Sequence, residues 1–121
     1  MSSKLKTSPT TANVFHITSD KEFNEIILKA ASNNITVFAK FGAEWCGPCK
    51  RIQPHYEELA NIHTNSIFLC IDVDKVKNLS AAYGVSSLPT FLVFKDAKYS
   101  LLTKGANLKL LKELVENQLS V

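Results

Sequence analysis

A run of seven mostly apolar residues, from Ile35 to Phe41, constrains the fold of this chain most. Such a run predicts a strand that is buried on both faces, which is typical of the centre of an α/β sheet. Lys40 is the one charged residue in the run. Gly42 follows it, and helical spacing of apolar residues begins a few positions later. The chain is therefore predicted to fold around a buried strand that turns directly into a helix.

Strand-like and helix-like segments alternate along the rest of the chain. Further strands are predicted over residues 14–17, 67–73, 90–94 and 99–103. Further helices are predicted after the capping-box pair Ser19 and Glu22, before Gly84 and after Asn107. We therefore expect an α/β fold with a central mixed sheet of about five strands flanked by about four helices. Strands joined by helices should be parallel, and the last hairpin should be antiparallel.

The composition fits one domain. The chain has 121 residues, of which 45% are hydrophobic and 21% charged. Residues 1–12 are polar and contain no acidic residue, so we expect a flexible tail there and a domain over residues 13–121. The net charge of +3 is too small to indicate a nucleic-acid or membrane partner. No stretch approaches the roughly 20 apolar residues that span a bilayer.

The cysteine count indicates the redox compartment. Three cysteines is an odd number, which argues against a disulfide-stapled secreted scaffold and favours a reducing compartment such as the cytoplasm. The Ser, Thr, Lys and Pro of residues 1–12 also resemble a transit peptide, although arginine is missing. Import into an organelle therefore stays open as an alternative.

Cys46 and Cys49 are separated by Gly47 and Pro48 at the predicted start of a helix. Unpaired backbone N–H groups at a helix start favour the thiolate form of the first cysteine. The second cysteine lies one turn further on, where it can attack a mixed disulfide held on the first. The substrate disulfide then leaves as two thiols, and the cysteine pair is oxidised. The spacing therefore predicts a redox pair.

Two other interpretations of the pair fit less well. A structural zinc site usually takes four ligands from two clusters, and the remaining candidates form no second cluster: Cys70, His16, His55 and His63. A purely structural disulfide between residues this close would constrain little of the unfolded chain. We therefore expect no bound metal.

The sequence resembles the thioredoxin family from about residue 14 to residue 119. The matching segments are Phe41, Ala43–Lys50 with its Trp-Cys-Gly-Pro-Cys motif, Pro54, Asp72–Asp74, Tyr83–Val85, Leu88–Thr90 and Lys104–Ala106. The resemblance implies the thioredoxin fold and the reduction of protein disulfides, with Cys46 as nucleophile and Cys49 as resolving thiol. It implies no bound cofactor, because electrons come from NADPH through a separate thioredoxin reductase. It also implies a monomer that acts on oxidised proteins such as peroxiredoxins.

The resemblance implies further site residues. Pro89 would be a cis proline opposite the disulfide, and Gly47, Pro48 and Pro89 would tune the pair. Lys40, on the central strand beneath the pair, is a further candidate for tuning it. The backbone of Leu88 would offer hydrogen bonds to an extended substrate segment. A mostly apolar, gently convex docking surface would surround the thiols, formed by Trp45, Val85, Ser86, Leu88, Gly105 and Ala106.

Lys40 departs from the family pattern, because most members carry a buried aspartate there that is thought to help move the proton of the resolving thiol. A charged lysine beneath the pair would favour thiolates, whereas a neutral lysine could accept the proton of Cys49. The alternative is a lysine that reaches solvent or pairs with Glu57 or Glu58. Lys40 also keeps open a second hypothesis for the whole protein, an adaptor in which the redox pair is incidental.

Other positions near the pair carry smaller expectations. Cys70 replaces a charged residue of many family members, and we expect it to neighbour Lys40 and behave as a small buried hydrophobe. Gly42 replaces an aromatic residue, which predicts a less filled wall of the site. Trp45 is expected on the surface, and Asp72 with Asp74 is expected to begin the next turn and helix.

Overall fold

The computed structural model describes residues 13–120. The expected tail over residues 1–12 lies outside the described residues, and the domain boundary stays a prediction. Within residues 13–120 the strands are β1 (Val14–Ile17), β2 (Val37–Gly42), β3 (Ile67–Asp72), β4 (Thr90–Lys95) and β5 (Lys98–Lys104). The helices are α1 (Asp20–Ser32), α2 (Gly47–Ile62), α3 (Lys77–Ala82) and α4 (Leu108–Leu119).

The strands form one mixed sheet in the order β1-β3-β2-β4-β5. β1, β3 and β2 are parallel, β4 is antiparallel to β2, and β5 is antiparallel to β4. β2 lies at the centre, and all of its residues are buried. The predicted mixed sheet, its buried central strand and its antiparallel final hairpin are therefore confirmed.

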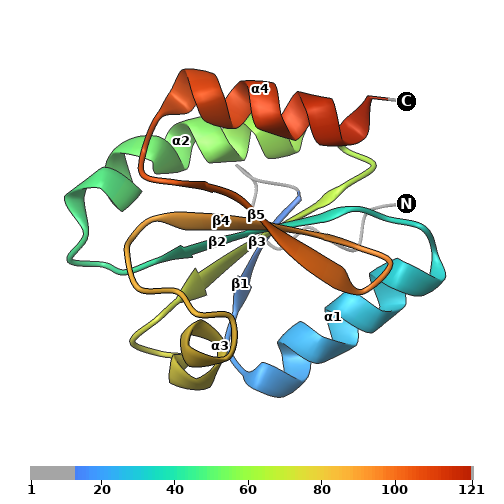
Figure 1. Ribbon diagram of the computed structural model, residues 1–121, viewed down its shortest axis with the longest axis horizontal. Helices are drawn as coiled ribbons and strands as arrows, with labels where there is room; N and C mark the ends of the chain where they lie inside the picture. The colour runs from blue at the N-terminus through green and yellow to red at the C-terminus, as the bar shows by residue number, and fades with distance from the viewer. Residues whose placement is uncertain (1–12, 121) are drawn as a thin grey trace.

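Helices cover both faces of the sheet, with α1 and α3 on one side and α2 and α4 on the other (Figure 1). On the first side Phe23 of α1 packs edge-on against Tyr83 and Phe94. On the second side Tyr56 of α2 packs against Phe68 and Phe91 and donates its hydroxyl proton to the carbonyl of Leu69 at 2.8 Å. Each such fully buried aromatic contributes roughly 1.5–3 kcal/mol by leaving water, so the two cores fix the sheet between the helices.

Side chains cap two helices where the sequence predicted it. Ser19 Oγ accepts a hydrogen bond from the N–H of Glu22 at 3.1 Å, and Asn107 Oδ1 accepts from the N–H of Leu110 at 3.0 Å. Glu22 Oε1 accepts in turn from the N–H of Thr18 at 2.8 Å, one residue before the expected partner. These bonds satisfy N–H groups that a helix start leaves unpaired.

The start of α3 corrects one expectation. Asp72 accepts the N–H of Asp74 at 2.9 Å and so closes a turn, but the helix begins only at Lys77, after Val76, which makes no side-chain cap. The aspartates therefore start the turn and not the helix. Gly84 ends this segment with φ of +66°, the left-handed conformation that glycine adopts without strain.

Candidate active site

Cys46 and Cys49 are joined by a disulfide at the junction of β2 and α2. Cys46 is the N-cap of α2, and its Sγ accepts a hydrogen bond from the N–H of Cys49 at 3.2 Å. Pro48 lies in the first turn, where its missing N–H leaves no gap in the helix. After reduction the same helix start would favour a thiolate on Cys46. The motif is thus held in the geometry that dithiol chemistry needs.

Gly42 allows the second sulfur to pack directly against the end of β2. A methyl group added at Gly42 would lie 3.2 Å from Cys49 Sγ and 3.4 Å from Cys49 Cβ. At this position no side chain separates Cys49 from the end of β2.

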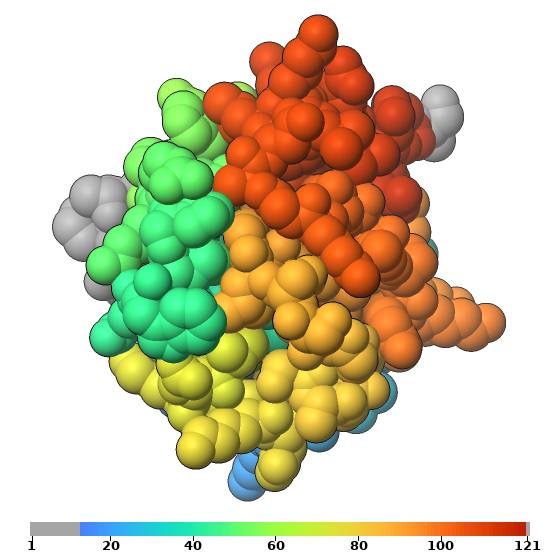
Figure 2. Space-filling model, turned by 60° about the vertical axis from the view of Figure 1, so that its left-hand side comes forward, coloured from blue at the N-terminus to red at the C-terminus, as the bar shows by residue number. Residues whose placement is uncertain are grey.

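A shallow cavity of about 470 Å³, which we call the front hollow, opens beside Cys46. Figure 2 shows this end of the molecule, where the start of α2 faces the segments that precede β4. The lining is uncharged and consists of Trp45, Cys46, Gly47, Pro48, Val73, Ser80, Val85, Ser86 and Leu88. The expected docking residues before β4 thus meet the motif, across a hollow instead of a convex surface.

The segment around Pro89 borders the disulfide. The Leu88–Pro89 peptide bond is cis, and Leu88 packs against the buried Cys46 and Cys49. Among the backbone hydrogen bonds of residues 13–120, none involves the N–H or C=O of Leu88. Gly105 donates its N–H to the carbonyl of Pro89 at 2.8 Å, whereas Gly105 and Ala106 do not line the front hollow.

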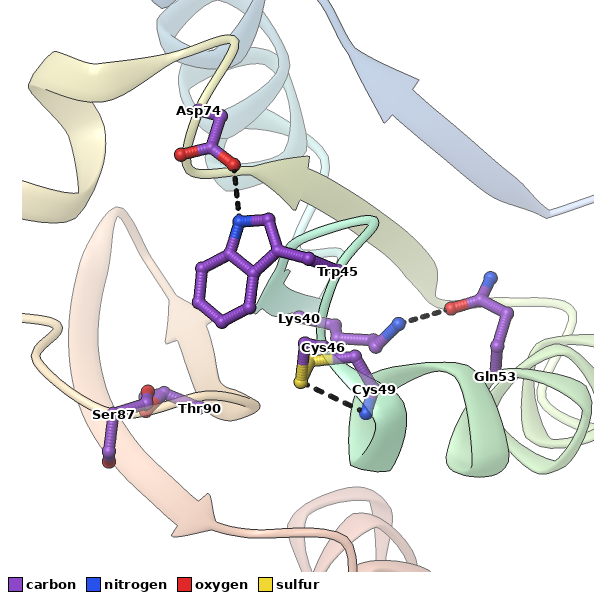
Figure 3. The surroundings of a disulfide bond; sticks show 8 residues. All are labelled: Lys40, Trp45, Cys46, Cys49, Gln53, Asp74, Ser87 and Thr90. Atoms are coloured by element: carbon purple, nitrogen blue, oxygen red, sulfur yellow. Dashed lines mark hydrogen bonds between the residues drawn. A yellow bond between two sulfur atoms is a disulfide. The ribbon is translucent and has the colours of Figure 1, made fainter.

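Trp45 lies on the surface with 71% of its area exposed. Its Nε1–H donates to Asp74 Oδ2 at 2.7 Å, so the indole ring is held beside the disulfide (Figure 3). No sequence pattern had indicated a role for Asp74 at the site. The position of Asp74 could have revealed this role. Asp74 follows the end of β3, and the carboxyl ends of the parallel strands β2 and β3 meet at one edge of the sheet.

Lys40 is buried, with 7% of its area exposed, and it does not extend to solvent. Its Nζ donates to Gln53 Oε1, and Gln53 Nε2 donates to Glu57 Oε2 at 3.0 Å. Lys40 is therefore linked to Glu57 through the Gln53 amide. Burial lowers the pKa of Lys40, while the nearby Cys70 and Glu57 act to raise it. Sequence reasoning missed Gln53, although it lies four residues after Cys49 and so on the same side of α2.

Cys70 pairs in register with Lys40, so the expected neighbourhood is confirmed. Gln53 Nε2 lies 3.5 Å from Cys70 Sγ. Burial raises the pKa of the Cys70 thiol, which Lys40 partly offsets. Cys70 is half-buried, which is less covered than expected, and it packs beside the core under α2 and α4.

A second cavity of about 340 Å³, the rear hollow, lies on the β1 side of the disulfide. Its lining includes His16, Lys40, Cys49, Gln53 and Cys70. No group of three or more His, Cys, Asp or Glu side chains suited to a metal occurs within residues 13–120. In the same residues no helix is long and apolar enough to cross a membrane.

A disulfide at a helix start, opening on an uncharged hollow beside a cis proline, defines a dithiol–disulfide oxidoreductase. A family model for thioredoxin matches residues 14–117. Thioredoxin 1 of Plasmodium falciparum is 43% identical over 100 residues, 83% of this chain and 92% of the relative. A thioredoxin H-type from Populus jackii is 37% identical over 95 residues, 78% of this chain and 68% of the relative.

Solved structures agree with the sequence relatives. The crystal structure of a poplar thioredoxin h matches with a TM-score of 0.84 at 34% identity, covering 90% of this chain and 98% of that chain. The chain belongs to the thioredoxin family. Its Cys46–Cys49 pair therefore performs dithiol–disulfide exchange on protein disulfides, and an adaptor with an incidental redox pair is not favoured.

Proposed function

We propose that the protein receives electrons from NADPH through a separate thioredoxin reductase and passes them to disulfides of other proteins. The observation that carries the proposal is the position of the Cys46–Cys49 pair, at the start of α2 and beside the uncharged front hollow. No bound cofactor takes part, because both electrons are stored in the two thiols.

The reaction runs in two exchanges. The thiolate of Cys46 attacks a substrate disulfide, so that one substrate sulfur bonds to Cys46 and the other leaves as a thiolate. Cys49 then attacks Cys46 Sγ, the second substrate sulfur leaves, and the Cys46–Cys49 disulfide forms. The reductase returns two electrons, and two protons complete the dithiol.

Substrate docking is proposed at the front hollow. An extended substrate segment would pair with the backbone N–H and C=O of Leu88, which no backbone hydrogen bond among residues 13–120 engages. Its side chains would contact Trp45, Val85 and Ser86, with Gly105 and Ala106 extending the contact beyond the hollow. Backbone pairing accepts many sequences, which suits a reductant of many proteins. Gly47, Pro48, Lys40 and Pro89 are proposed to tune the pair.

Oxidised peroxiredoxins are one proposed substrate class. A similar structure, with a TM-score of 0.78 at 28% identity, is described as showing the thiol resolving mechanism in yeast mitochondrial 1-Cys peroxiredoxin via glutathione/thioredoxin systems. We further propose a monomer that maintains redox homeostasis in the cytoplasm. The partly buried thiol of Cys70, which has no disulfide partner among the described residues, fits a reducing compartment.

Insulin reduction coupled to NADPH oxidation by a thioredoxin reductase tests the function. We expect turnover by the wild type, no turnover by Cys46→Ser, and a trapped mixed disulfide with substrate in Cys49→Ser. Cys70→Ser is the matched control, because it removes a thiol outside the pair, and it should keep wild-type turnover. A wild type that shows no turnover, or a Cys46→Ser variant that retains it, would contradict the proposal.

A further inference from the structure

Lys40 and Cys70 form a pair of reactive groups behind the redox disulfide. They are register partners on the neighbouring parallel strands β2 and β3, so their side chains emerge on the same face of the sheet. Both line the rear hollow. The two exchanges of the Cys46–Cys49 pair do not use the thiol of Cys70, which has no disulfide partner among the described residues.

The side-chain amide of Gln53 brings the lysine amine and the cysteine sulfur together. Its Oε1 accepts a hydrogen bond from Lys40 Nζ, and Cys70 Sγ lies 3.8 Å from the same oxygen. Gln53 Nε2 lies 3.5 Å from Cys70 Sγ and donates to Glu57 Oε2 at 3.0 Å, which fixes the amide. Figure 3 shows the amine of Lys40 directed towards Gln53. A nitrogen nucleophile and a thiol thus meet at one side chain.

The rear hollow gives a small oxidant a route to the Cys70 sulfur. Cys70 is half-buried, and its register partner on β1 is His16, which is exposed and lines the same hollow. The cavity of about 340 Å³ has room for hydrogen peroxide, a molecule not much larger than water. The residue beside the oxidised sulfur would be Lys40, of which only 7% is exposed.

Charge couples the two groups. Burial raises the pKa of the Cys70 thiol, while Lys40 and the Gln53 amide act to lower it and so favour the thiolate that a peroxide attacks. Burial lowers the pKa of Lys40, while Cys70 and Glu57 act to raise it. Oxidation of the thiolate to an uncharged sulfenic acid removes one of the two charges that hold the ammonium. Lys40 then loses its proton more readily and becomes a nucleophile.

We propose that Lys40 and Cys70 form a covalent modification site, at which hydrogen peroxide joins the lysine nitrogen to the cysteine sulfur as a sulfenamide. A sulfenic acid condenses in this way with a nitrogen that lies close to it. The inference goes beyond the proposed function, because it concerns a thiol outside the redox pair.

The reaction takes two steps. The thiolate of Cys70 attacks one oxygen of hydrogen peroxide, the O–O bond breaks, and the departing hydroxide takes up a proton, which leaves water and the sulfenic acid. The neutral amine of Lys40 then attacks the sulfur. An S–N bond forms, the S–O bond breaks, and the hydroxyl group leaves as a second water with a proton of the amine. The thiol and the amine together lose two hydrogen atoms, and one peroxide is reduced to two waters.

The bridge is reversible and changes the rear hollow. Two thiols of a reductant restore the Cys70 thiol and the Lys40 amine and are themselves oxidised to a disulfide. While it persists, the bridge joins β2 to β3 and removes the charge of Lys40 from the hollow that Cys49 also lines. Exposure to peroxide would thus leave a reversible mark directly behind the redox pair.

Mass spectrometry of the oxidised full-length protein tests the bridge. With Cys46 and Cys49 joined, Cys70 is the one free thiol in the sequence, so a further loss of hydrogen cannot come from an internal disulfide. After treatment with hydrogen peroxide we expect a monomer that has lost two hydrogen atoms. Tryptic digestion should give one peptide pair linked between Lys40 and Cys70, and dithiothreitol should separate it.

Two substitutions of Lys40 distinguish condensation from oxidation of Cys70. Lys40→Arg keeps a positive charge beside the thiol, but a guanidinium does not give up its proton and cannot condense. Lys40→Met removes the amine and places an apolar side chain in the core. In both variants Cys70 should stay at the sulfenic acid, so dimedone should label it several-fold more than in the wild type, where the amine is already in place. Lys75→Met removes an exposed lysine of the same hollow and should still form the bridge.

Four results would overturn the proposal. The first is a wild type that loses no hydrogen on treatment, and the second is a loss that persists in Lys40→Met. The third is a disulfide between two copies of the chain through Cys70 in place of the bridge. The fourth is equal dimedone labelling of the wild type and both Lys40 variants. Insulin turnover enters none of these results, so a failure of the proposed function would be seen separately.

Discussion

Gly42 controls how closely the resolving cysteine can approach the central strand. Because Gly42 has no side chain, Cys49 Sγ can pack close to it. A methyl group added at Gly42 would lie only 3.2 Å from this sulfur. The sulfur is fixed by the helix start and, in the oxidised state, by its bond to Cys46. A closely packed atom that cannot move makes the site sensitive to one added carbon.

We predict that Gly42→Ala destabilises the oxidised protein by about 1–2 kcal/mol, within the usual range for overpacking a core. The reduced protein should lose less, because the free Cys49 thiol can rotate away. Urea unfolding of both redox forms measures the difference. Gly47→Ala is the matched control, because its methyl would meet only the flexible end of Arg51 at 3.5 Å. Equal losses in both redox forms would contradict the explanation.

The chemistry at residue scale was predictable where it depends on spacing along the chain. Cys46, Cys49 and their place at a helix start follow from four consecutive residues. Asp74 and Gln53 did not stand out, because their roles depend on which side chains meet across the sheet edge and across α2. A single polar residue on a helix has many possible partners, and only the fold selects Lys40 as the partner of Gln53.

The turn between β4 and β5 holds two residues other than glycine in the left-handed backbone conformation. Its two central residues, Asp96 and Ala97, have φ of +57° and +64° and lack the glycine that this turn favours. An alanine in the left-handed region costs about 1–2 kcal/mol. The flanking strands, held by their cross-strand pairs, impose this conformation on Ala97.

Replacing Ala97 by glycine should therefore stabilise the protein by about 1 kcal/mol, since glycine removes the strain but adds freedom to the unfolded chain. Thermal unfolding would show the gain as a higher Tm. Ala31→Gly in α1 serves as the opposite control and should lower Tm, because glycine is a poor helix former. A lower Tm for Ala97→Gly would contradict the proposed strain.

The elements themselves were largely predictable. Ser19, Asn107 and Gly84 mark helix ends by local hydrogen bonding and backbone freedom, so the sequence indicates them directly. The start of α3 did not follow this logic, since Val76 offers no side-chain cap. That helix is placed instead by packing, through Leu79 against the core under α1.

At the scale of the whole molecule, the burial of Lys40 costs stability. The buried amine is held by one amide and lies among apolar residues of β2, where an apolar side chain would pack without loss of hydration. The order of strands that places Cys70 beside it is a non-local property, and no local pattern in the sequence determines that order.

The pH dependence of stability should show this cost. Burial lowers the pKa of Lys40 from its ordinary 10.5, so the unfolded chain binds this proton more tightly than the folded protein does. Stability therefore rises with pH between the lowered pKa and 10.5. Burial raises the pKa of the Cys70 thiol from its ordinary 9.0, so the contribution of Cys70 to the free energy of unfolding falls as pH rises above about 9. Above about pH 9 the fall from Cys70 therefore opposes the rise from Lys40.

Lys40→Met should raise the free energy of unfolding at pH 7 by about 1 kcal/mol or more, and it should remove the part of the rise with pH that Lys40 causes below its ordinary pKa of 10.5. Urea unfolding across this pH range makes the measurement, with Lys75→Met as the control that keeps the wild-type slope. A variant less stable than the wild type at pH 7 would show that the Lys40–Gln53 contact outweighs the cost of burial.

The separation of the two hollows also bears on inhibitor selectivity. A compound placed in the front hollow would meet the Trp-Cys-Gly-Pro-Cys motif that the family shares. A compound in the rear hollow would meet the amine of Lys40, the amide of Gln53 and the thiol of Cys70. The resemblance implies a carboxylate at this position in most members of the family, so a ligand that binds the amine of Lys40 would distinguish this protein from them.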